Sequence, residues 1–288
     1  MIRDEPQADM HLHSTFSDGE LSPRELVRLA KEKGLTGICL TDHETIAGEK
    51  EFKAALAEFN MRGIMGAEFF AQFEEKIVHL LVYGVNADNW HFFEKIAKKN
   101  HAAHEHYART ILERYRRAKL MDVNLDEVKM FRTNRGPFVN FVDILYFRAN
   151  KYQLNPFEVH EELCQNFGRM TNLQLDVATA EEIFEASNKA DTVVSWAHSG
   201  LQLTEPDGQE YLREAIPYFV TKGLKALEVN HPANTALART YLSSVCLQRN
   251  LYKTGGSDFH GPVVHPKIKF ACVTAHERCF AELWRKLM

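Results

Sequence analysis

The stretch Asp9-Met10-His11-Leu12-His13-Ser14-Thr15-Phe16-Ser17-Asp18-Gly19 guides the interpretation of the whole chain. Side chains alternate between the two faces of a β-strand, so His11 and His13 would project from one face and could grip one cation. Ser17, Asp18 and Gly19 are typical turn residues, and such a turn would bring the Asp18 carboxylate to the same strand end. A His-x-His pair alone is weak evidence, so a metal site requires further ligands elsewhere in the chain.

Further ligand-type side chains recur along the chain, each at or near the end of a strand-like segment. Strand-like segments are expected over residues 35–41, 63–68, 77–83, 191–198, 224–231 and 251–261. The ligand-type residues that they carry are Asp42, His43, Glu68, His79, His198, His231, Asp258 and His260. Independent structural histidines would not be expected to recur at the same position of a repeated unit.

Helical patterns alternate with these strands. Ser22 is a favourable N-cap, Pro23 suits the first helical position, and Gly34 would end the helix. Similar patterns cover residues 47–59, 209–222 and 235–249, and residues 281–288 read as a short amphipathic helix packed on the fold. The alternation predicts parallel strands closed into a barrel, in which all carboxyl ends meet at one rim.

The alternation of strands and helices stops between residues 88 and 188, where the pattern is mostly helical and richer in Lys, Arg and His. Helices are expected over residues 90–120, 138–149, 156–165 and 180–187. We therefore predict a barrel formed by residues 1–87 and 189–288, with an inserted helical cap over residues 88–188 that selects the substrate.

Length and composition exclude several classes of protein. The chain has 288 residues, of which 45% are hydrophobic and 26% charged, as expected of a globular protein, and it has no apolar run that could span a membrane. Residues 1–6 lack the apolar core of a secretory signal, so a cytoplasmic location is expected. A net charge of −4 gives no general basic field for long nucleic acid. The five cysteines are scattered and odd in number, which argues against disulfides and a zinc ribbon.

The recurring ligand types predict a multinuclear metal centre at the rim of the barrel. The donors are imidazoles and carboxylates without thiolates, which favours zinc, manganese or iron and leaves the choice among the three open. Two or three such divalent ions can polarise a phosphoryl oxygen, activate water and stabilise a leaving oxygen. Phosphoester hydrolysis is the reaction that this centre suits best.

The motifs in their order resemble those of the PHP (polymerase and histidinol phosphatase) family. They are His11-Leu12-His13, Asp18-Gly19, Thr41-Asp42-His43, Glu68, His79, Ala197-His198 and Gly256-Ser257-Asp258-Phe259-His260-Gly261. The resemblance implies an α/β fold of the amidohydrolase-like type, a distorted (β/α)7 TIM-like barrel, with a trinuclear centre. It covers roughly the first ninety and last hundred residues and is weak across the middle.

The resemblance also implies a role for each of nine ligands. A first ion would be held by His11, His13, Glu68 and Asp258, and a second by Glu68, His79 and His198. A third would be held by Asp18, His43 and His260. In this scheme a hydroxide that bridges two ions attacks phosphorus, and we expect Asp258, His198 and His231 to take part in catalysis.

Within that family the chain most resembles small stand-alone phosphoesterases acting on nucleotide bisphosphates or cyclic phosphates. Arg132 and Arg135 flank Thr133-Asn134, and the planar arginine fork could anchor a substrate phosphate. The bisphosphate-specific members carry an arginine followed closely by a histidine there, whereas this chain reads Arg135-Gly136-Pro137-Phe138-Val139-Asn140. Cyclic phosphates and other small phosphoesters therefore stay open as substrates.

Three polar residues near the predicted rim stand outside the nine expected ligands. Asp42 would either orient the imidazole of His43 or begin a helix. His231 would contact the substrate phosphate, donate a proton, or simply occupy a turn. Glu228 lies inside its strand, where a structural hydrogen bond is the simplest role.

Two further groups are expected to be solvated. His265 and Lys267 follow the last motif and would either line the mouth of the site or lie in an exposed loop, the latter being favoured. His101 and His104, and less closely His106, share one face of the predicted cap helix, for which a solvated surface is the default.

Two other functions are compatible with the same residues. A 5′-3′ exonuclease acting on short oligonucleotides would use the same metal chemistry, and Arg114-Tyr115-Arg116-Arg117 is the one dense basic cluster that could support it. A non-catalytic module would keep the metals without turnover, although such modules usually lose ligands. The oligomeric state is left open.

Overall fold

The fold is a nearly closed α/β barrel. The computed structural model describes residues 7–132, 135–167 and 175–288, so Met1–Pro6, considered above for a signal, and Thr133-Asn134 lie outside the described residues. Within these ranges eight strands form one sheet in the order β7-β6-β5-β4-β3-β2-β1-β8. They are β1 (Gln7–Asp9), β2 (Gly37–Leu40), β3 (Arg62–Phe73), β4 (Lys76–Tyr83), β5 (Val193–Trp196), β6 (Leu224–Asn230), β7 (Tyr252–Gly255) and β8 (Ala275–His276).

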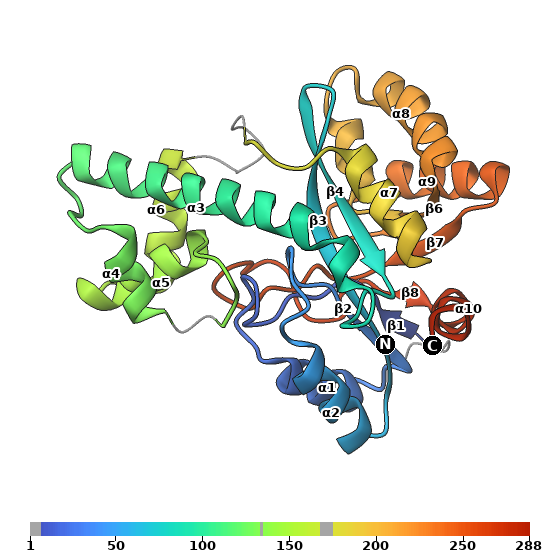
Figure 1. The fold of residues 1–288 in the computed structure, drawn as a ribbon, viewed down its shortest axis with the longest axis horizontal. Coiled ribbons are helices and arrows are strands. Elements are labelled where there is room, and N and C mark those ends of the chain that lie inside the picture. Colours follow the sequence, from blue (N-terminus) through green and yellow to red (C-terminus); the bar gives the residue numbers. More distant parts are fainter. Residues whose placement is uncertain (1–6, 133–134, 168–174) are drawn as a thin grey trace.

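The segment that follows β1 closes the sheet onto the segment that follows β7. Met10 N donates to Gly255 O over 3.2 Å, and His13 N donates to Phe259 O over 3.2 Å. Leu12 forms a parallel bridge with Phe259. The predicted α/β class, a distorted TIM-like barrel with a helical insertion, is confirmed (Figure 1).

Two strands depart from the predicted parallel arrangement, and one of them, β8, pairs antiparallel with β1 at the end of the sheet. β1, β2 and β3 are mutually parallel, as are β5, β6 and β7, but β4 runs antiparallel to both β3 and β5. The sequence between β3 and β4 has only Glu74 and Glu75, and Glu74 turns the chain with a φ of 52°. A parallel crossover needs a dozen or more residues, so this connection can only form a hairpin.

Helices cover the outside of the barrel. They are α1 (Pro23–Glu32), α2 (Glu49–Glu58), α7 (Ala180–Ala190), α8 (Gly208–Lys222), α9 (Ala236–Arg249) and α10 (Glu277–Leu287). α1 begins as predicted, because the Ser22 side chain accepts from Glu25 N and the Glu25 side chain reaches back to Ser22 N. α10, expected over residues 281–288, starts earlier and buries Phe280 and Leu283 against β1 and β3.

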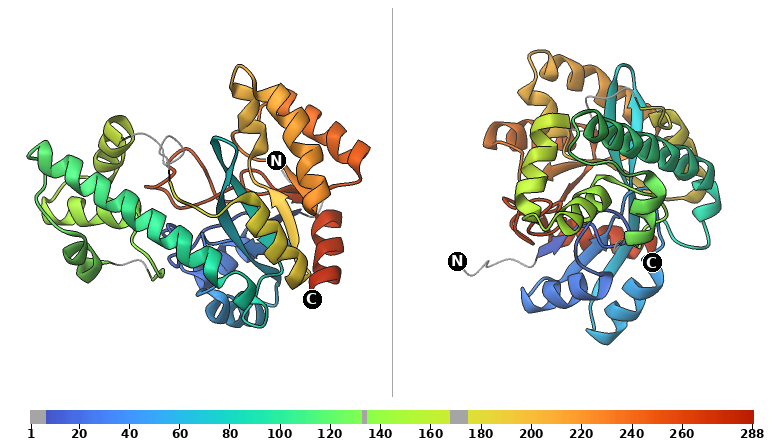
Figure 2. Two further views of the ribbon diagram at one scale, coloured as in Figure 1. Left: turned by 45° about the horizontal axis from the view of Figure 1, so that its top comes forward. Right: turned by 90° about the vertical axis from the view of Figure 1, so that its left-hand side faces the viewer.

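Four more helices form a group that projects from one side of the barrel (Figures 1 and 2). They are α3 (Glu94–Arg117), α4 (Leu125–Phe131), α5 (Phe141–Lys151) and α6 (Pro156–Phe167), and short 3-10 helices occur at η1 (Trp90–Phe92) and η3 (Ser199–Thr204). The four share a separate core that includes Tyr107, Ile111, Leu145 and Val159. α7 instead packs on β3, β4, β5 and α8. The boundaries at residues 88 and 188 stay a prediction.

No helix among the described residues is both long and apolar enough to cross a membrane.

The packing of α10 gives a test of the barrel core. Phe280 is fully buried, and its ring lies over Gly37 of β2. Replacing Phe280 by alanine should lower the free energy of unfolding by about 3–5 kcal/mol, because it removes a large buried ring and leaves a cavity. Urea denaturation followed by circular dichroism would measure the change. Leu247→Ala, on the exposed face of α9, is the control and should change it by less than about 0.5 kcal/mol. Equal stability of the two variants would contradict the described packing of α10.

Candidate metal centre

His11 and His13 lie just beyond β1, at the closure of the barrel. β1 is shorter than predicted and ends at Asp9, and from there the chain pairs with the segment that follows β7. Both imidazoles are completely buried, and their ring centroids are 5.2 Å apart. The expected placement of the two rings on one face is therefore reached through closure of the barrel.

The Glu68 carboxylate is the centre of the cluster. Its Oε2 lies 3.1 Å from Nε2 of both His11 and His13. Its Oε1 lies 3.0 Å from Nδ1 of His79 and 3.3 Å from Nε2 of His198. Each carboxylate oxygen thus faces a different pair of imidazoles, which is the arrangement of a bridging ligand.

Asp258 lies beside the same two imidazoles as Glu68 Oε2, those of His11 and His13. Its Oδ1 lies 3.3 Å from Nε2 of both His11 and His13, and its Oδ2 accepts from His231 Nε2 over 3.3 Å. Asp258 has a φ of 54° and His198 a φ of 33°, so both follow their strands in the left-handed region. That conformation is uncommon for residues other than glycine and is concentrated at functional sites.

Asp18 is the centre of a further group. Its Oδ1 lies 3.4 Å from His260 Nε2, and its Oδ2 lies 3.7 Å from His43 Nε2. Asp18 belongs to the turn after His13, where Ser17 N and Gly19 N both donate to Ser14 O. A Cβ at position 19 would clash with the backbone of His13, so only glycine fits this turn.

The structure brings the nine predicted ligands together in three groups, in each of which the potential ligand atoms lie within 4.8 Å of one another. The groups are His11, His13, Glu68 and Asp258; Glu68, His79 and His198; and His13, Asp18, His43 and His260. They match the sets that the family resemblance implied, with His13 added to the third. Their role as ligands stays a prediction.

The chemistry of these atoms fits divalent cations. Within the described ranges, both ring nitrogens of His13, Asp18 Oδ1, His43 Nδ1 and His79 Nε2 are buried without a hydrogen-bond partner. His13 Nε2 is close to Glu68 Oε2 but lacks the geometry of a hydrogen bond. Buried polar atoms are normally satisfied, and a cation between these donors would satisfy them.

Glu68 and His43 favour the forms that bind a cation, whereas at His11, His13 and His198 burial lowers the pKa but the neighbouring carboxylates outweigh it and raise the pKa. Burial raises the pKa of Glu68, but the imidazoles of His11, His43 and His79 outweigh this effect and hold the pKa well below its usual value. Burial lowers the pKa of His43 to about 4. A charged carboxylate and a neutral imidazole are the forms that bind a metal ion.

Glu228 supports two of the predicted ligands from inside β6. Its Oε1 accepts from His11 Nδ1 over 2.9 Å, and its Oε2 accepts from His198 N over 2.6 Å. The structural hydrogen bond suggested by the sequence is present, and it fixes the ring of one ligand and the backbone of another. Such an acceptor orients an imidazole and increases its basicity.

Two buried aspartates hold the loops of the cluster. The sequence suggested that Asp42 orients His43 or begins a helix, and the structure shows neither. Its carboxylate accepts from Ser14 N, Ser14 Oγ and Ser17 Oγ, at 2.6–2.7 Å. Asp9, not singled out from the sequence, accepts from Ser257 N over 2.9 Å and from Ser257 Oγ over 2.6 Å. Each aspartate therefore anchors a loop that carries predicted ligands.

The two arginines proposed for substrate binding lie near the cluster but outside its groups. Arg135 N donates to Thr15 O over 2.6 Å, and its guanidinium pairs with Glu51 over 2.6 Å and lies 4.1 Å from the centroid of the Phe16 ring. Arg132 Nη2 donates to Gly136 O over 2.7 Å. Arg135 thus borders the loop that leads to Asp18, whereas Arg132 Nε lies 3.4 Å from Asp143 Oδ2.

His265 is a residue of the cluster that the sequence interpretation placed in an exposed loop. It forms a fourth group with Asp258 and His260, and its ring centroid is 4.3 Å from that of His260. Glu20 Oε1 folds the loop inward by accepting from Val263 N and Val264 N. Nothing local in the sequence indicates this long-range contact. Lys267 is exposed, as favoured.

The histidines of α3 are a second correction. His104 is buried and His101 half-buried, whereas His106 alone is exposed. Both inward-facing rings bind Glu44, as described below. Helical spacing showed that the first two share a face but not what covers that face.

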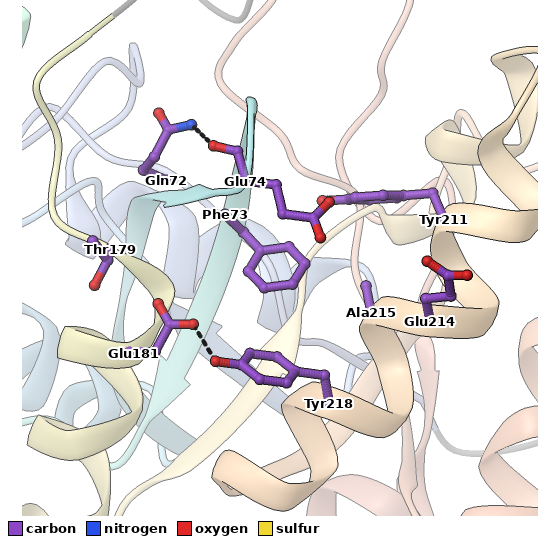
Figure 3. A pocket seen from close by; sticks show the side chains of 9 residues that line it. All are labelled: Gln72, Phe73, Glu74, Thr179, Glu181, Tyr211, Glu214, Ala215 and Tyr218. Carbon is purple, nitrogen blue, oxygen red and sulfur yellow. Dashed lines mark hydrogen bonds between the residues drawn. The ribbon is translucent and has the colours of Figure 1, made fainter.

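A cavity of about 660 Å³ lies apart from the cluster, between the tip of the β3–β4 hairpin, α7 and α8 (Figure 3). Phe73, Tyr211 and Tyr218 line it, and the Tyr218 hydroxyl donates to Glu181 Oε1 over 2.7 Å. None of the nine predicted ligands lines this cavity. It is therefore not the metal centre.

A barrel that carries a buried cluster of imidazoles and carboxylates is the arrangement of a metal-dependent hydrolase. Residues 9–177 match the PHP domain, which is more than half of the chain. The chain belongs to the PHP family and is a hydrolase that acts on phosphoric ester bonds.

Similar proteins and structures agree with this assignment. The chain is 24% identical over 263 residues to the 5′-3′ exoribonuclease Rnm of Escherichia coli, which covers 88% of this chain and 85% of that protein. A 5′-3′ exoribonuclease of Haemophilus influenzae is 42% identical over 83 residues, 29% of this chain and 30% of that protein. A structure from Bifidobacterium adolescentis, described as a metal-dependent phosphoesterase, superposes with a TM-score of 0.81 over 98% of both chains at 23% identity. An amidohydrolase from Chromobacterium violaceum gives 0.77 at 19% identity, over 97% of this chain and 96% of that one.

Metal binding can be tested without a substrate. Purified protein stripped with a chelator and dialysed against Mn²⁺ should retain two or three ions per chain, as predicted, counted by mass spectrometry, and its melting temperature should rise because the ions bind only the folded state. Asp258→Asn should bind fewer ions, since Asp258 faces two imidazoles of the first group. Glu210→Gln is the control: the Glu210 side chain lies on the exposed face of α8, and this variant should bind as many ions as the unaltered protein. Equal metal content in all three proteins would exclude Asp258 as a ligand.

Proposed function

We propose that this chain hydrolyses a small phosphorylated metabolite, either a cyclic phosphodiester or a phosphomonoester such as a nucleoside 3′,5′-bisphosphate. The observation that carries the proposal is the Glu68 carboxylate, whose two oxygens face two different pairs of imidazoles. We propose as metal ligands His11, His13, Asp18, His43, Glu68, His79, His198, Asp258 and His260. Two or three divalent ions, manganese, iron or zinc, would supply Lewis-acid stabilisation of charge on the phosphoryl oxygens.

Three residues of the chain have distinct proposed roles in the reaction. Asp258 and His198 would bind the ions at which the reaction takes place, and each has a left-handed backbone just after its strand. His231 donates from Nε2 to Asp258, and its Nδ1 accepts from Ala233 N, so its ring is fixed beside the centre. We propose that His231 contacts the phosphoryl group or gives a proton to the leaving oxygen.

The proposed cap, residues 88–188, selects the substrate. Asn140, at the start of α5, donates from Nδ2 to Ser17 O over 2.8 Å, which ties the cap beside the loop of Asp18. Arg135 and Arg132 lie on the same side. We propose that one of them anchors a substrate phosphate, with Arg135 exchanging Glu51 for the anion.

Loss of turnover in single variants is the direct test. Asp258→Asn and His198→Ala should each lower kcat/KM for phosphate release by at least about 100-fold, because loss of an orienting neighbour of a metal ligand alone costs about 10–100-fold. The manganese-loaded protein would be assayed on cyclic phosphates, nucleoside 3′,5′-bisphosphates and simple monoesters such as histidinol phosphate, with the monoester product also followed. Glu210→Gln should match the unaltered protein. Full activity after removal of the metals would refute the proposal.

A 5′-3′ exonuclease acting on short oligonucleotides is the second candidate. Its support is the likeness to the E. coli exoribonuclease across 88% of the chain. The Arg114–Arg117 cluster lies at the C-terminal end of α3, away from the barrel in Figure 1, and Arg116 and Arg117 pair with Glu113. A groove for a strand would need its basic side chains nearer the cluster.

Substrate competition separates the two candidates. With manganese-loaded protein, kcat/KM for the best small phosphoester should exceed that for a 5′-phosphorylated RNA trinucleotide at least about 10-fold, a difference of about 1.4 kcal/mol in transition-state stabilisation. The reverse order would favour the exonuclease. In that case replacing Arg114, Arg116 and Arg117 by alanine would show whether the cluster binds RNA, with the small phosphoester as the internal control. Metal binding without any turnover would favour the non-catalytic module.

A further inference from the structure

Glu44 lies between two of the proposed metal ligands. It follows His43 directly and has a φ of 47°, in the left-handed region that few glutamates adopt. Its N donates to Glu68 O over 2.9 Å, and its side chain is completely buried. Neither the family resemblance nor the clusters described above give this carboxylate a role.

The partners of Glu44 come mainly from the first half of α3. Oε1 accepts from Phe70 N over 2.8 Å and from Asn100 Nδ2 over 3.2 Å. Oε2 accepts from His104 Nε2 over 2.9 Å, and the backbone O accepts from His101 Nε2 over 2.8 Å. Three side chains of one helix thus converge on a single residue of the barrel.

Phe70 links Glu44 to two residues of the cluster, His43 and His79. Its ring stacks on His43, with centroids 5.0 Å apart and an interplanar angle of 12°, and meets His79 edge-on at 4.1 Å. Asn100 Nδ2 also donates to Phe70 O over 2.8 Å, so Glu44 and Asn100 hold the backbone of Phe70 from both sides. A shift of α3 would therefore move the ring that packs on two ligands.

We propose that Glu44 is a positioning residue that couples the seating of α3 to the geometry of His43 and His79. A buried carboxylate is costly unless its oxygens are hydrogen-bonded, and one of its donors here, His104, comes from α3. With α3 displaced, Glu44 would lose that partner, and His43 and Phe70 would lose their support. The inference deepens the proposed function, because it assumes that His43 and His79 bind metal.

His104→Phe is the test variant. Phenylalanine keeps the stacking of His104 on Phe138, whose centroid is 4.5 Å away, but removes the donor to Glu44. In the full chain, equilibrium dialysis against Mn²⁺ should show the weakest-bound ion held about 10–100-fold less tightly, the usual effect of losing support behind a ligand. We expect kcat to fall with it and KM to change little, since no proposed substrate contact is removed.

Glu162→Gln is the matched control. Glu162 pairs with Arg148 over 3.0 Å between α5 and α6, so the variant loses a partly buried ion pair of the cap that touches none of the nine residues. Its Mn²⁺ affinity should equal that of the unaltered protein. The same loss of affinity in both variants would show general weakening of the cap and overturn the proposal.

Glu44→Gln is a second test variant, which keeps the proposal testable if His104→Phe does not fold. Glutamine keeps an oxygen for Phe70 N but loses the charge that faces His104, so Mn²⁺ affinity should fall in the same direction. Unchanged affinity in the folded variants would overturn the positioning role while leaving the proposed function intact. Weaker Mn²⁺ binding in the variants, with no phosphoester turnover by the unaltered protein, would support the positioning role and refute the proposed function.

Discussion

The arrangement of the site depends on one buried carboxylate, that of Glu68, shared between two pairs of imidazoles. An isolated charge in such a place would be very costly, so its neighbours must compensate it. Here four imidazole nitrogens lie within 3.3 Å of its two oxygens. Closure of the barrel and the hairpin that follows Glu68 both serve to bring those rings to it.

The backbone around Glu68 explains why an antiparallel strand can contribute to a rim built mainly from parallel ones. Glu68 N donates to Asp42 O, which extends the pairing of β2 with β3 past the end of β2. On the other side of β3, Phe70 lies opposite His79 in the ladder with β4. A slip of one residue in this hairpin would turn His79 to the opposite face and remove it from the cluster. The hairpin register therefore matters as much as the strand ends.

The residue types of the cluster could be predicted because they recur at local, readable positions at strand ends. What supports them could not, since it depends on distant pairings: Asp9 binds Ser257, 248 residues away, and His11 binds Glu228, 217 residues away. His265 joins the cluster only because Glu20 folds its loop inward. The same limit applies to His104, whose helical face was visible in the sequence while Glu44, its partner, was not.

The structure separates proposed ligand carboxylates from supporting ones, which stand one or two residues before a proposed ligand histidine in the sequence. Asp9 and Asp42 are surrounded by serine hydroxyls and backbone N–H groups, and burial raises the pKa of Asp9 to about 7 in spite of them. Asp258 faces imidazoles, and although burial opposes this, His11 and His260 hold its pKa well below the usual value. A carboxylate whose oxygens are already occupied by N–H and O–H donors has little left to offer a cation, whereas one facing imidazoles can share a cation with them once those rings have lost a proton. The partners of each acid, rather than its place in a motif, therefore decide which carboxylates can bind metal and which only hold the loops in place.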